Sequence, residues 1–340
     1  MANNLIKRLK KDLLKLDAGH QLTERQLSQL ERKIGAVYAD AAKEISATIN
    51  KYWRGFYKRD AEMRARLEDG EIDKQYYKAW LRNQIGRGER FERMREELVT
   101  SIHHVNEIAN GMINEGTLGV YVMNRNYTSY IIEKVHPQAS FTLYNKAAIK
   151  RILLHDPNLM PYYPPLRALK RGIDLAYGEK IIRRSITQGI LQGHGIKQIE
   201  KSMRDRIVGM NRESSIRAAR TAYTNAQNGG RLDQMLEAQA KGIRVEKQWL
   251  STSDGRTRDS HVEANGEIRA LNEKFSTGLM HPADREGRPE EVYNCRCTML
   301  HVINGQSIMP DKLLIEGATT QTAKRDFLDW SKRKGGKADE

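Results

Sequence analysis

The residues of this chain best suited to chemistry lie in two short runs of its C-terminal third. The first run, W-L-S-T-S-D-G-R-T-R-D-S-H (249–261), places acidic, basic and imidazole side chains among turn formers, and the second, N-C-R-C (294–297), contains both cysteines. Such groups can bind a metal ion, transfer protons or form a hydrogen-bonded network. The residues concerned are Asp254, Arg256, Arg258, His261, His281, Asn294, Cys295, Arg296 and Cys297.

The order of these residues resembles that of a known family. D-x-R-T-R-x-x-H, then Gly266, then Phe275 and finally N-C-R-C is similar to the C-terminal domain of the phage Mu F-like minor head proteins, which are head-morphogenesis components of tailed phages. The resemblance runs from about Arg217 to Val302 and, less distinctly, back to about Asn110. It implies a minor capsid protein carried in few copies inside the phage head. Its implied partners are the portal protein, other head proteins and packaged double-stranded DNA.

A structural zinc site is one chemistry for the cluster. Many members of the family carry C-x-x-C where this chain has residues 258–261, and with C-x-C that pair would give four thiolates for tetrahedral zinc. Arginine stays protonated and cannot be a ligand. The remaining candidates are His261, Cys295 and Cys297, with His281 as a replacement. Because both upstream cysteines are absent, we expect no metal and no other cofactor.

Catalysis is a second chemistry. Asp254, His261 and His281, with Arg256 beside them, resemble the acid, base and phosphate-binding content of a metal-dependent, nuclease-like DNA-processing enzyme. The chain has no G-x-S-x-G, H-E-x-x-H or P-loop motif to accompany them. We therefore expect no enzymatic activity.

The interpretation we favour is structural. Asp254 can accept hydrogen bonds from turn amides and from Arg256 or Arg258, while His261 and Arg296 complete a network that holds a small loop-rich domain together. The cysteines are then small buried residues. Removal of Asp254 or Arg296 is expected to unfold the domain.

Charge suggests a polyanionic neighbour. The 340 residues carry 58 Lys and Arg against 43 Asp and Glu, a formal net charge of +15. Basic side chains that face phosphates release condensed counterions, which favours nucleic acid over a merely soluble basic surface. The sequence has no zinc-finger, homeodomain or RRM signature, so contact with DNA is expected to be non-specific. The candidate contacts are Arg217, Arg220, Lys324, Arg325, Lys332, Arg333 and Lys334.

Cysteine content and hydropathy indicate the compartment. Two cysteines cannot form a disulfide framework. Charged residues follow the N-terminus at once, and no window reaches the about 18 apolar residues of a membrane span. We expect a protein assembled in the host cytoplasm and found in the virion. A toxin-delivery module, the other setting of Mu F-like domains, is not expected because only about 38 residues follow Val302.

The fold predicted around these residues is mainly α, with an extended N-terminal helical region followed by a small α+β Mu F-like domain. Residues 1–110 form the helical region, as a bundle or a coiled coil that could self-associate. Thr23 and Gln26 are expected to cap its first helix, and a second helix should cover 72–102. The apolar stripe of the first helix is Leu27, Leu30, Ile34, Val37, Ala41, Ile45, Ile49 and Tyr52.

A connector with short strands is predicted at 111–165, because 119–123 and 127–132 are rich in β-formers and glycines at 111, 116 and 119 suggest turns. The Mu F-like domain is predicted at 166–303. It begins with helices at 166–177 and 178–192, a break at His194, a short helix at 196–203 and a long helix at 213–240. By resemblance, Arg220 and Asn225 on the long helix should bind backbone or carboxylate groups of the motif region.

The α+β motif region is predicted at 243–303. It should contain a strand at 243–250, a turn at 252–255, a short helix at 260–264 and a closing strand from Cys297 to Ile303. A basic tail, 304–340, follows, with a helix at 323–334.

Overall fold

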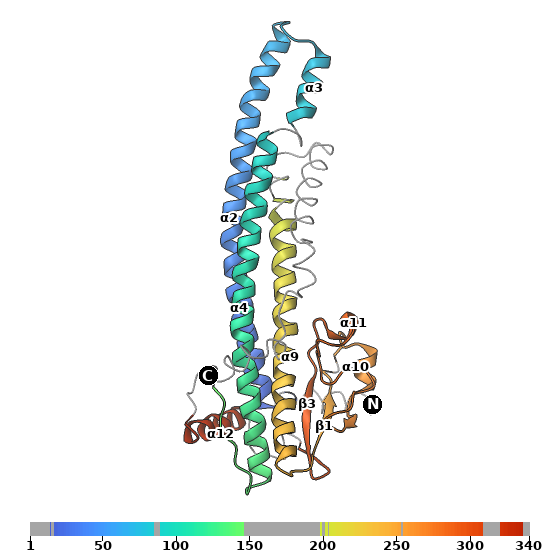
Figure 1. The fold of residues 1–340 in the computed structure, drawn as a ribbon. Coiled ribbons are helices and arrows are strands. Elements are labelled where there is room, and N and C mark those ends of the chain that lie inside the picture. Colours follow the sequence, from blue (N-terminus) through green and yellow to red (C-terminus); the bar gives the residue numbers. More distant parts are fainter. Residues whose placement is uncertain are drawn as a thin grey trace. The chain divides into compact units, whose positions relative to one another are not determined.

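The computed structural model describes residue 14, residues 17–84, 89–145, 198, 201–202, 204–252, 254–308 and 320–335. The fold is mainly helical with one small sheet near the C-terminus, as predicted (Figure 1). The helices are α2 (Ala18–Glu68), α3 (Lys74–Gln84), α4 (Glu89–Val135), the π-helix η2 (Asp205–Gly209), α9 (Met210–Ala240), α10 (Asp259–Glu263), α11 (Pro289–Val292) and α12 (Thr320–Arg333). The strands are β1 (Val245–Leu250), β2 (Ile268–Arg269), β3 (Thr298–Ile303) and β4 (Gln306–Ile308).

The described residues fall into two compact units. Unit 1 takes its residues from 1–31, 112–163 and 217–340, and unit 2 from 32–111 and 164–216. Because α2, α4 and α9 are long, each contributes residues to both units. The chemistry-bearing motifs belong to unit 1. Of the described helices, none has the length and apolar character needed to cross a bilayer.

Unit 2 is a helix bundle whose core is the predicted apolar stripe. Ile34, Ile45 and Ile49 of α2 are completely buried, as are Phe91 and Leu98 of α4. Aromatic edge contacts continue this core, with the Tyr52 ring centroid 6.3 Å from that of Phe91. Tyr38, and not the neighbouring Val37 of the predicted stripe, is the buried core residue at this point of α2. Its hydroxyl hydrogen-bonds to the Ser215 hydroxyl across 2.8 Å. The stripe is therefore covered by this chain's own helices.

Two local predictions in this region are wrong. Thr23 does not cap α2, since the helix begins at Ala18 and the Thr23 hydroxyl donates to the Gly19 carbonyl at 2.9 Å. The cap is Asp17, whose carboxylate accepts from the His20 amide at 2.9 Å. The true cap lies six residues before Thr23, and Gly19 and His20, which have low helix propensity, obscure that helix start in the sequence.

The strands predicted at 119–123 and 127–132 are also wrong, because both segments belong to α4. Residues 120–132 are buried on every side, so their β-branched side chains pack in a helix that has no solvent face there. Gly116 is a packing position and not a turn, since a Cβ there would lie 1.9 Å from the Tyr223 hydroxyl oxygen. The helix ends at Val135, just before His136 and Pro137, where proline disfavours helical backbone.

Several predicted elements cannot be compared with the structure. The helices at 166–177 and 178–192, the break at His194 and most of the short helix at 196–203 lie outside the described residues. The long helix predicted at 213–240 is confirmed as α9, which begins three residues earlier, at Met210.

The sheet of unit 1 is antiparallel, in the order β2-β1-β3-β4. β1 and β3 pair along their full lengths, from Val245 opposite Ile303 to Leu250 opposite Thr298. Asn304 and Gly305 join β3 to β4 with positive φ angles of 51° and 78°, the backbone of a tight two-residue hairpin. The predicted strands at 243–250 and 297–303 and the short helix at 260–264 are confirmed as β1, β3 and α10.

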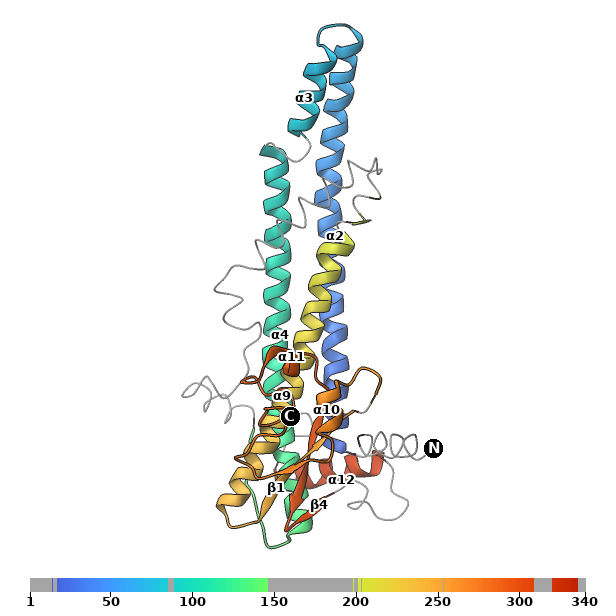
Figure 2. The ribbon, with the colours of Figure 1, turned by 90° about the vertical axis from the view of Figure 1, so that its right-hand side faces the viewer.

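Helix α9 packs against both the sheet and α4 within unit 1 (Figures 1 and 2). Gly230 permits the contact with α4, because a Cβ there would lie 2.5 Å from the Tyr121 carbonyl oxygen. Arg125 of α4 forms an ion pair with Glu237 at 2.8 Å beside this contact. The glycine and the ion pair together place α9 between α4 and the strands.

Arg231 of α9 is the central buried charge of unit 1. Its guanidinium forms a two-pronged ion pair with Asp17, at 2.7 and 2.8 Å. It also donates to the Asn124 side chain at 3.1 Å and to the Met299 carbonyl at 2.8 Å. Burial opposes ionisation of Asp17, but Arg231 holds the pKa of that carboxyl below its usual value. One guanidinium thus joins α2, α4, α9 and β3.

We expect Asp17→Asn to cost about 3–5 kcal/mol of unfolding free energy, since it leaves a buried guanidinium without its counter-charge. Asparagine remains a good helix cap, so the loss reports the charge and not the cap. Urea denaturation of the full chain measures it. The control is Lys43→Ala, which breaks the exposed pair with Asp40 and should change stability by less than about 1 kcal/mol. Equal effects of the two substitutions would contradict this role for Arg231.

Candidate functional site

Two loops of unit 1 bring the motif residues together. The first leaves β1 at Leu250 and leads into α10, which carries His261. The second leaves α11, turns at Asn294 with a φ of 58°, and carries the cysteines into β3. Asparagine adopts this left-handed backbone more readily than most residues. The turn is held by the Asn294 amide, which donates to the Thr221 hydroxyl of α9 at 2.9 Å.

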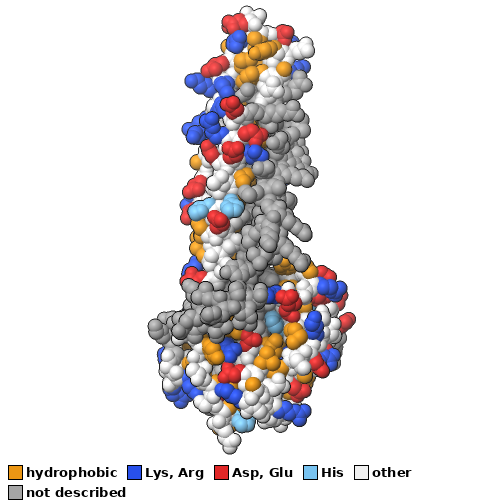
Figure 3. Space-filling view, in the orientation of Figure 1, with side chains coloured by type: hydrophobic (Ala, Val, Ile, Leu, Met, Phe, Trp, Pro, Cys, Tyr) orange, Lys and Arg blue, Asp and Glu red, His pale blue; other side chains and the backbone are white. Residues whose placement is uncertain are grey.

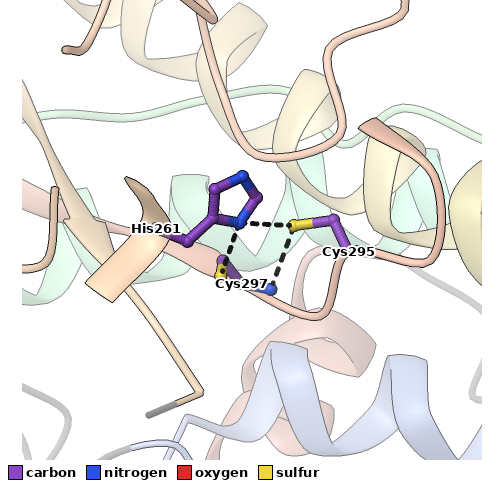
Figure 4. A group of neighbouring side chains, drawn as sticks. All are labelled: His261, Cys295 and Cys297. Atoms are coloured by element: carbon purple, nitrogen blue, oxygen red, sulfur yellow. Dashed lines mark hydrogen bonds between the residues drawn. The ribbon is translucent and has the colours of Figure 1, made fainter. Parts of the chain in front are cut away.

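His261, Cys295 and Cys297 form a buried cluster (Figure 4). The imidazole Nδ1 points at both sulfurs, 3.6 Å from Cys295 Sγ and 3.5 Å from Cys297 Sγ. All three side chains are at most 2% exposed. The Trp249 ring packs edge-on against the imidazole, with a centroid distance of 5.0 Å. Both cysteines are free thiols.

The other ring nitrogen of His261 faces a carboxylate. Its Nε2 lies 3.0 Å from Glu291 Oε2, and the Ser260 hydroxyl donates to the same oxygen at 2.8 Å. Between the thiols, contact with Cys295 and then with His261 lowers the pKa of Cys297, while contact with Cys297 and burial raise the pKa of Cys295. The arrangement therefore favours negative charge on Cys297.

The donor set suits a zinc ion, because zinc in proteins takes thiolate and imidazole ligands. Among the described histidine, cysteine and carboxylate side chains, the group has three members, His261, Cys295 and Cys297. The fourth ligand suggested by the sequence, His281, is not one of them. Zinc bound here would cross-link the two loops, which is a structural and not a catalytic contribution.

His281 belongs to a different contact, on the side of α9. Its Nε2 would lie 3.8 Å from a Cβ placed on Gly229. The backbone turns sharply after it, with a φ of 60° at Ala283, and Asn225 of α9 donates to the Ala283 carbonyl at 2.7 Å. Burial lowers the pKa of His281. The turn that follows His281 and Pro282 thus packs against α9. Asn225 binds a backbone carbonyl of the motif region, as the family resemblance implied.

Asp254 and Arg296 form an ion pair that joins the two loops, a clasp in which Arg296, and not the expected Arg256 or Arg258, supplies the guanidinium. The Asp254 carboxylate pairs with both terminal nitrogens of Arg296, at 2.7 Å for Nη2. It also accepts from the Arg256 amide and the Thr257 hydroxyl, each at 3.0 Å. The Arg296 guanidinium, chiefly through this hydrogen bond, holds the pKa of Asp254 well below its usual range. The Asp254 side chain is 37% exposed, so the clasp lies at the surface.

The other predicted members of this network bind elsewhere. Arg256 contributes its backbone and not its guanidinium. Arg258 donates to the Tyr293 carbonyl, which ties α10 to α11. His261 lies in the thiol cluster. The prediction joined these residues because they are near in sequence, but Arg256 and Arg258 precede α10 while His261 lies within it, and each has a different partner.

The polar face of α9 holds the cysteine loop in place. Thr224 donates to the Cys295 carbonyl at 2.8 Å, and Asn228 donates to the Cys297 carbonyl at 3.2 Å. Asn228 also accepts from the Met299 amide at 3.0 Å. Asn225 of this face is expected from the sequence, whereas Gln227 and Arg231 are not. Their spacing of three or four residues was a usable signal, since it marks one polar face of a helix.

Lys247 has a structural role that the sequence does not predict. Its side chain is completely buried and donates to the carbonyls of Leu271 and Met280 at 3.0 and 2.8 Å. The ammonium also lies 5.2 Å from the centre of the Phe275 ring. Burial lowers the pKa of Lys247 to about 8. This lysine fixes the long loop between β2 and α11 to the sheet.

The candidate DNA-contact residues differ in availability. Arg220 is occupied by carboxylates of α2, 2.8 Å from Glu31 and 3.7 Å from Glu24, and not by the motif region as expected. Lys334 pairs with Glu133 at 2.9 Å. Lys324 is half-buried, and its pKa is lowered by burial and by nearby Arg25. The remaining members, Arg217, Arg325, Lys332 and Arg333, are exposed.

Comparisons with known proteins agree with the motif. Residues 180–300 match the sequence model of the family described as Phage Mu protein F like protein. The chain is 24% identical over 321 residues to the minor head protein GP7 of Bacillus phage SPP1, covering 91% of this chain and 94% of that protein. The predicted resemblance to Mu F-like minor head proteins is thereby confirmed.

A second relative is an enzyme. Over 128 residues the chain is 29% identical to the NAD(+)--arginine ADP-ribosyltransferase EFV of Enterococcus faecalis, covering 37% of this chain. The chain spans only 26% of the length of that enzyme. No solved structure matches the chain.

We expect Asp254→Asn to cost about 1 kcal/mol of unfolding free energy at pH 7, because a partly exposed ion pair is screened by solvent. The domain should therefore stay folded without this carboxylate, in contrast to the unfolding that the sequence analysis expects. Since the folded pKa of Asp254 is lowered, the contribution is full above the unfolded value of about 3.9 and is lost as the pH falls. The difference from wild type, measured by urea denaturation, should therefore shrink below about pH 4.

The control is Asp259→Asn, which removes an exposed carboxylate from the same segment. It should leave stability within about 0.5 kcal/mol of wild type. Equal stabilities of the two variants at pH 7 would show that the Asp254 clasp contributes nothing.

Proposed function

From the match of residues 180–300 to the Mu F-like family, we propose that this chain is a minor capsid protein that acts in head morphogenesis of a tailed bacteriophage. The observation that carries the proposal is the similarity to a phage minor head protein along 91% of this chain and 94% of that relative. A match limited to one domain would support only a shared fold. Agreement over nearly both full lengths supports a shared role.

The site supports an assembly role better than a catalytic one. A nuclease would need Asp254, His261 and His281 to converge on an open cleft. Instead Asp254 pairs with Arg296, His261 contacts two thiols, and His281 faces α9. The similarity to the ADP-ribosyltransferase covers 26% of that enzyme, and this share does not by itself support the same activity here. We propose that the chain is not an enzyme.

The proposed setting is the inside of the head next to the portal, with assembly in the host cytoplasm. The partners are the portal protein and other head proteins. Unit 2 buries its apolar stripe within its own bundle, so we do not assign self-association to that stripe. We retain the predicted division into a helical region (1–110), a Mu F-like domain (166–303) and a basic tail (304–340). The connector between them is helical up to Val135.

Non-specific contact with packaged DNA is proposed for the exposed basic residues. Among the described residues on the face drawn in Figure 3, Lys and Arg are interleaved with Asp and Glu. We therefore base the proposal on particular exposed basic groups. Arg325, Lys332 and Arg333 lie on the solvent side of α12, whose Phe327 and Trp330 pack inward on Tyr130 of α4. We assign the DNA contact to α12, with Arg217 of α9 as a further candidate.

We expect the protein in purified virions and its absence from heads assembled without the portal, because docking at the portal is what would recruit it. Mass spectrometry of both particles measures this, with the major capsid protein as the internal standard. Equal amounts in the two kinds of head would contradict portal docking. Absence from virions, together with normal heads when the chain is missing, would contradict the head-morphogenesis role itself.

We expect Lys332→Gln with Arg333→Gln to weaken DNA binding and to make its salt dependence shallower. Each lost phosphate contact should reduce the slope of log affinity against log salt by about 0.9. Fluorescence anisotropy with duplex DNA at several salt concentrations gives the slope. The control is Lys33→Gln with Lys43→Gln, which removes equal charge from exposed positions of α2. Equal slopes for the two double variants would contradict a DNA contact by α12.

A further inference from the structure

We propose that His261, Cys295 and Cys297 bind one zinc ion and that Glu291 positions the imidazole for it. This set differs from the four thiolates implied by the family resemblance, since one histidine and two cysteines supply all of its protein ligands. The inference does not depend on the proposed role in head assembly.

The two nitrogen–sulfur distances in this cluster are those of a tetrahedral zinc site. With zinc–nitrogen bonds of about 2.05 Å and zinc–sulfur bonds of about 2.3 Å, a tetrahedral angle separates the nitrogen from each sulfur by about 3.5–3.6 Å. The distances from His261 Nδ1 are 3.6 Å to Cys295 Sγ and 3.5 Å to Cys297 Sγ. All three atoms lie within 4.8 Å of one another. A single ion can therefore contact all of them.

Hydrogen bonds are the alternative to a metal ion in this cluster. An imidazole nitrogen offers either one lone pair or one proton, so one thiol would bond to it and the other to the neighbouring sulfur. The nitrogen and both sulfurs are buried, where an unsatisfied polar group is costly. A cation between them neutralises thiolate charge and satisfies all three donors together.

Glu291 and the backbone supply the outer contacts that such a site requires. The carboxylate oxygen 3.0 Å from Nε2 is not aligned for a hydrogen bond, but its charge favours a proton on that nitrogen, which leaves the Nδ1 lone pair for the sulfurs. Ser260 holds the carboxylate in place through its hydroxyl, at 2.8 Å. The Cys297 amide lies 3.5 Å from Cys295 Sγ and donates to it, which stabilises thiolate charge.

Zinc would fasten the loop after β1 to the loop before β3. His261 lies on α10, and the two cysteines precede the first residues of β3. The Asp254–Arg296 pair already joins the same loops at the surface. The metal would join the same two loops a second time, in the buried interior. With three protein ligands, the fourth position is left to water or to a group outside this cluster.

The test uses the purified full-length chain under reducing conditions, with zinc and cobalt as the probes. Zinc content after dialysis should be one per chain, and cobalt should give the absorption of a thiolate-bound tetrahedral ion. Cys295→Ser with Cys297→Ser should abolish both signals. His281→Gln is the control histidine and should keep both. Absence of the cobalt–thiolate absorption in the wild-type chain would overturn the proposal, and so would equal zinc content in wild type and the double cysteine variant.

Glu291→Gln tests the positioning role without removing a ligand. It should keep one zinc per chain and weaken the affinity, measured by competition with a chromophoric chelator, by about 10- to 100-fold. Its matched control is Glu290→Gln, which changes a neighbouring carboxylate that is 62% exposed. Equal affinities of these two variants would contradict the role of Glu291 and leave the three-ligand site to stand or fall on the cobalt spectrum.

Discussion

The structure of unit 1 depends on side chains of α9 that bind the part of β3 left unpaired by β4. β4 pairs with β3 only from His301 to Ile303, so among the described strands the start of β3 has no neighbour on that side. Because backbone groups alternate along a strand, the amide and carbonyl of Met299 point to the same side as those of Ile303. Asn228 accepts from that amide, and Arg231 donates to that carbonyl. A helix thereby completes the sheet, and the cysteine loop just before β3 is held by the same face.

This arrangement explains why a full positive charge is buried at the centre of the unit. A guanidinium can donate along several directions at once, and Arg231 uses them for Asp17, Asn124 and the strand. An apolar residue at this position would leave the Met299 carbonyl unsatisfied. The pairing with Asp17 joins residues 214 positions apart. The start of α2 is thus placed by the same group that completes β3.

The motif residues form one contact near the surface and one in the buried interior of unit 1. Asp254 and Arg296 meet near the surface, where solvent weakens the attraction, and their geometry fixes the mutual position of two loops. His261 and the cysteines meet beneath them, shielded by Trp249. Residues that would suggest a catalyst in a linear sequence are here turned toward each other and toward α9. This inward use of polar chemistry fits a component that must keep its shape within an assembly.

The sequence by itself determined the helical class, the strands and short helix of the motif region, the apolar stripe of α2 and the resemblance to Mu F-like proteins. These follow from periodicity and from residue order, which are local properties. Tertiary structure decided the rest. Residues 119–132 look like strands until their burial on every side is known, and His281 looks like a ligand until α9 takes it. The spacing of Arg231 places it on the polar face of α9, but nothing local identifies its partner Asp17, 214 positions away, or the pairing of Glu291 with His261. Which polar groups meet is fixed only when the helices and the sheet pack, since burial makes each unsatisfied donor or acceptor costly.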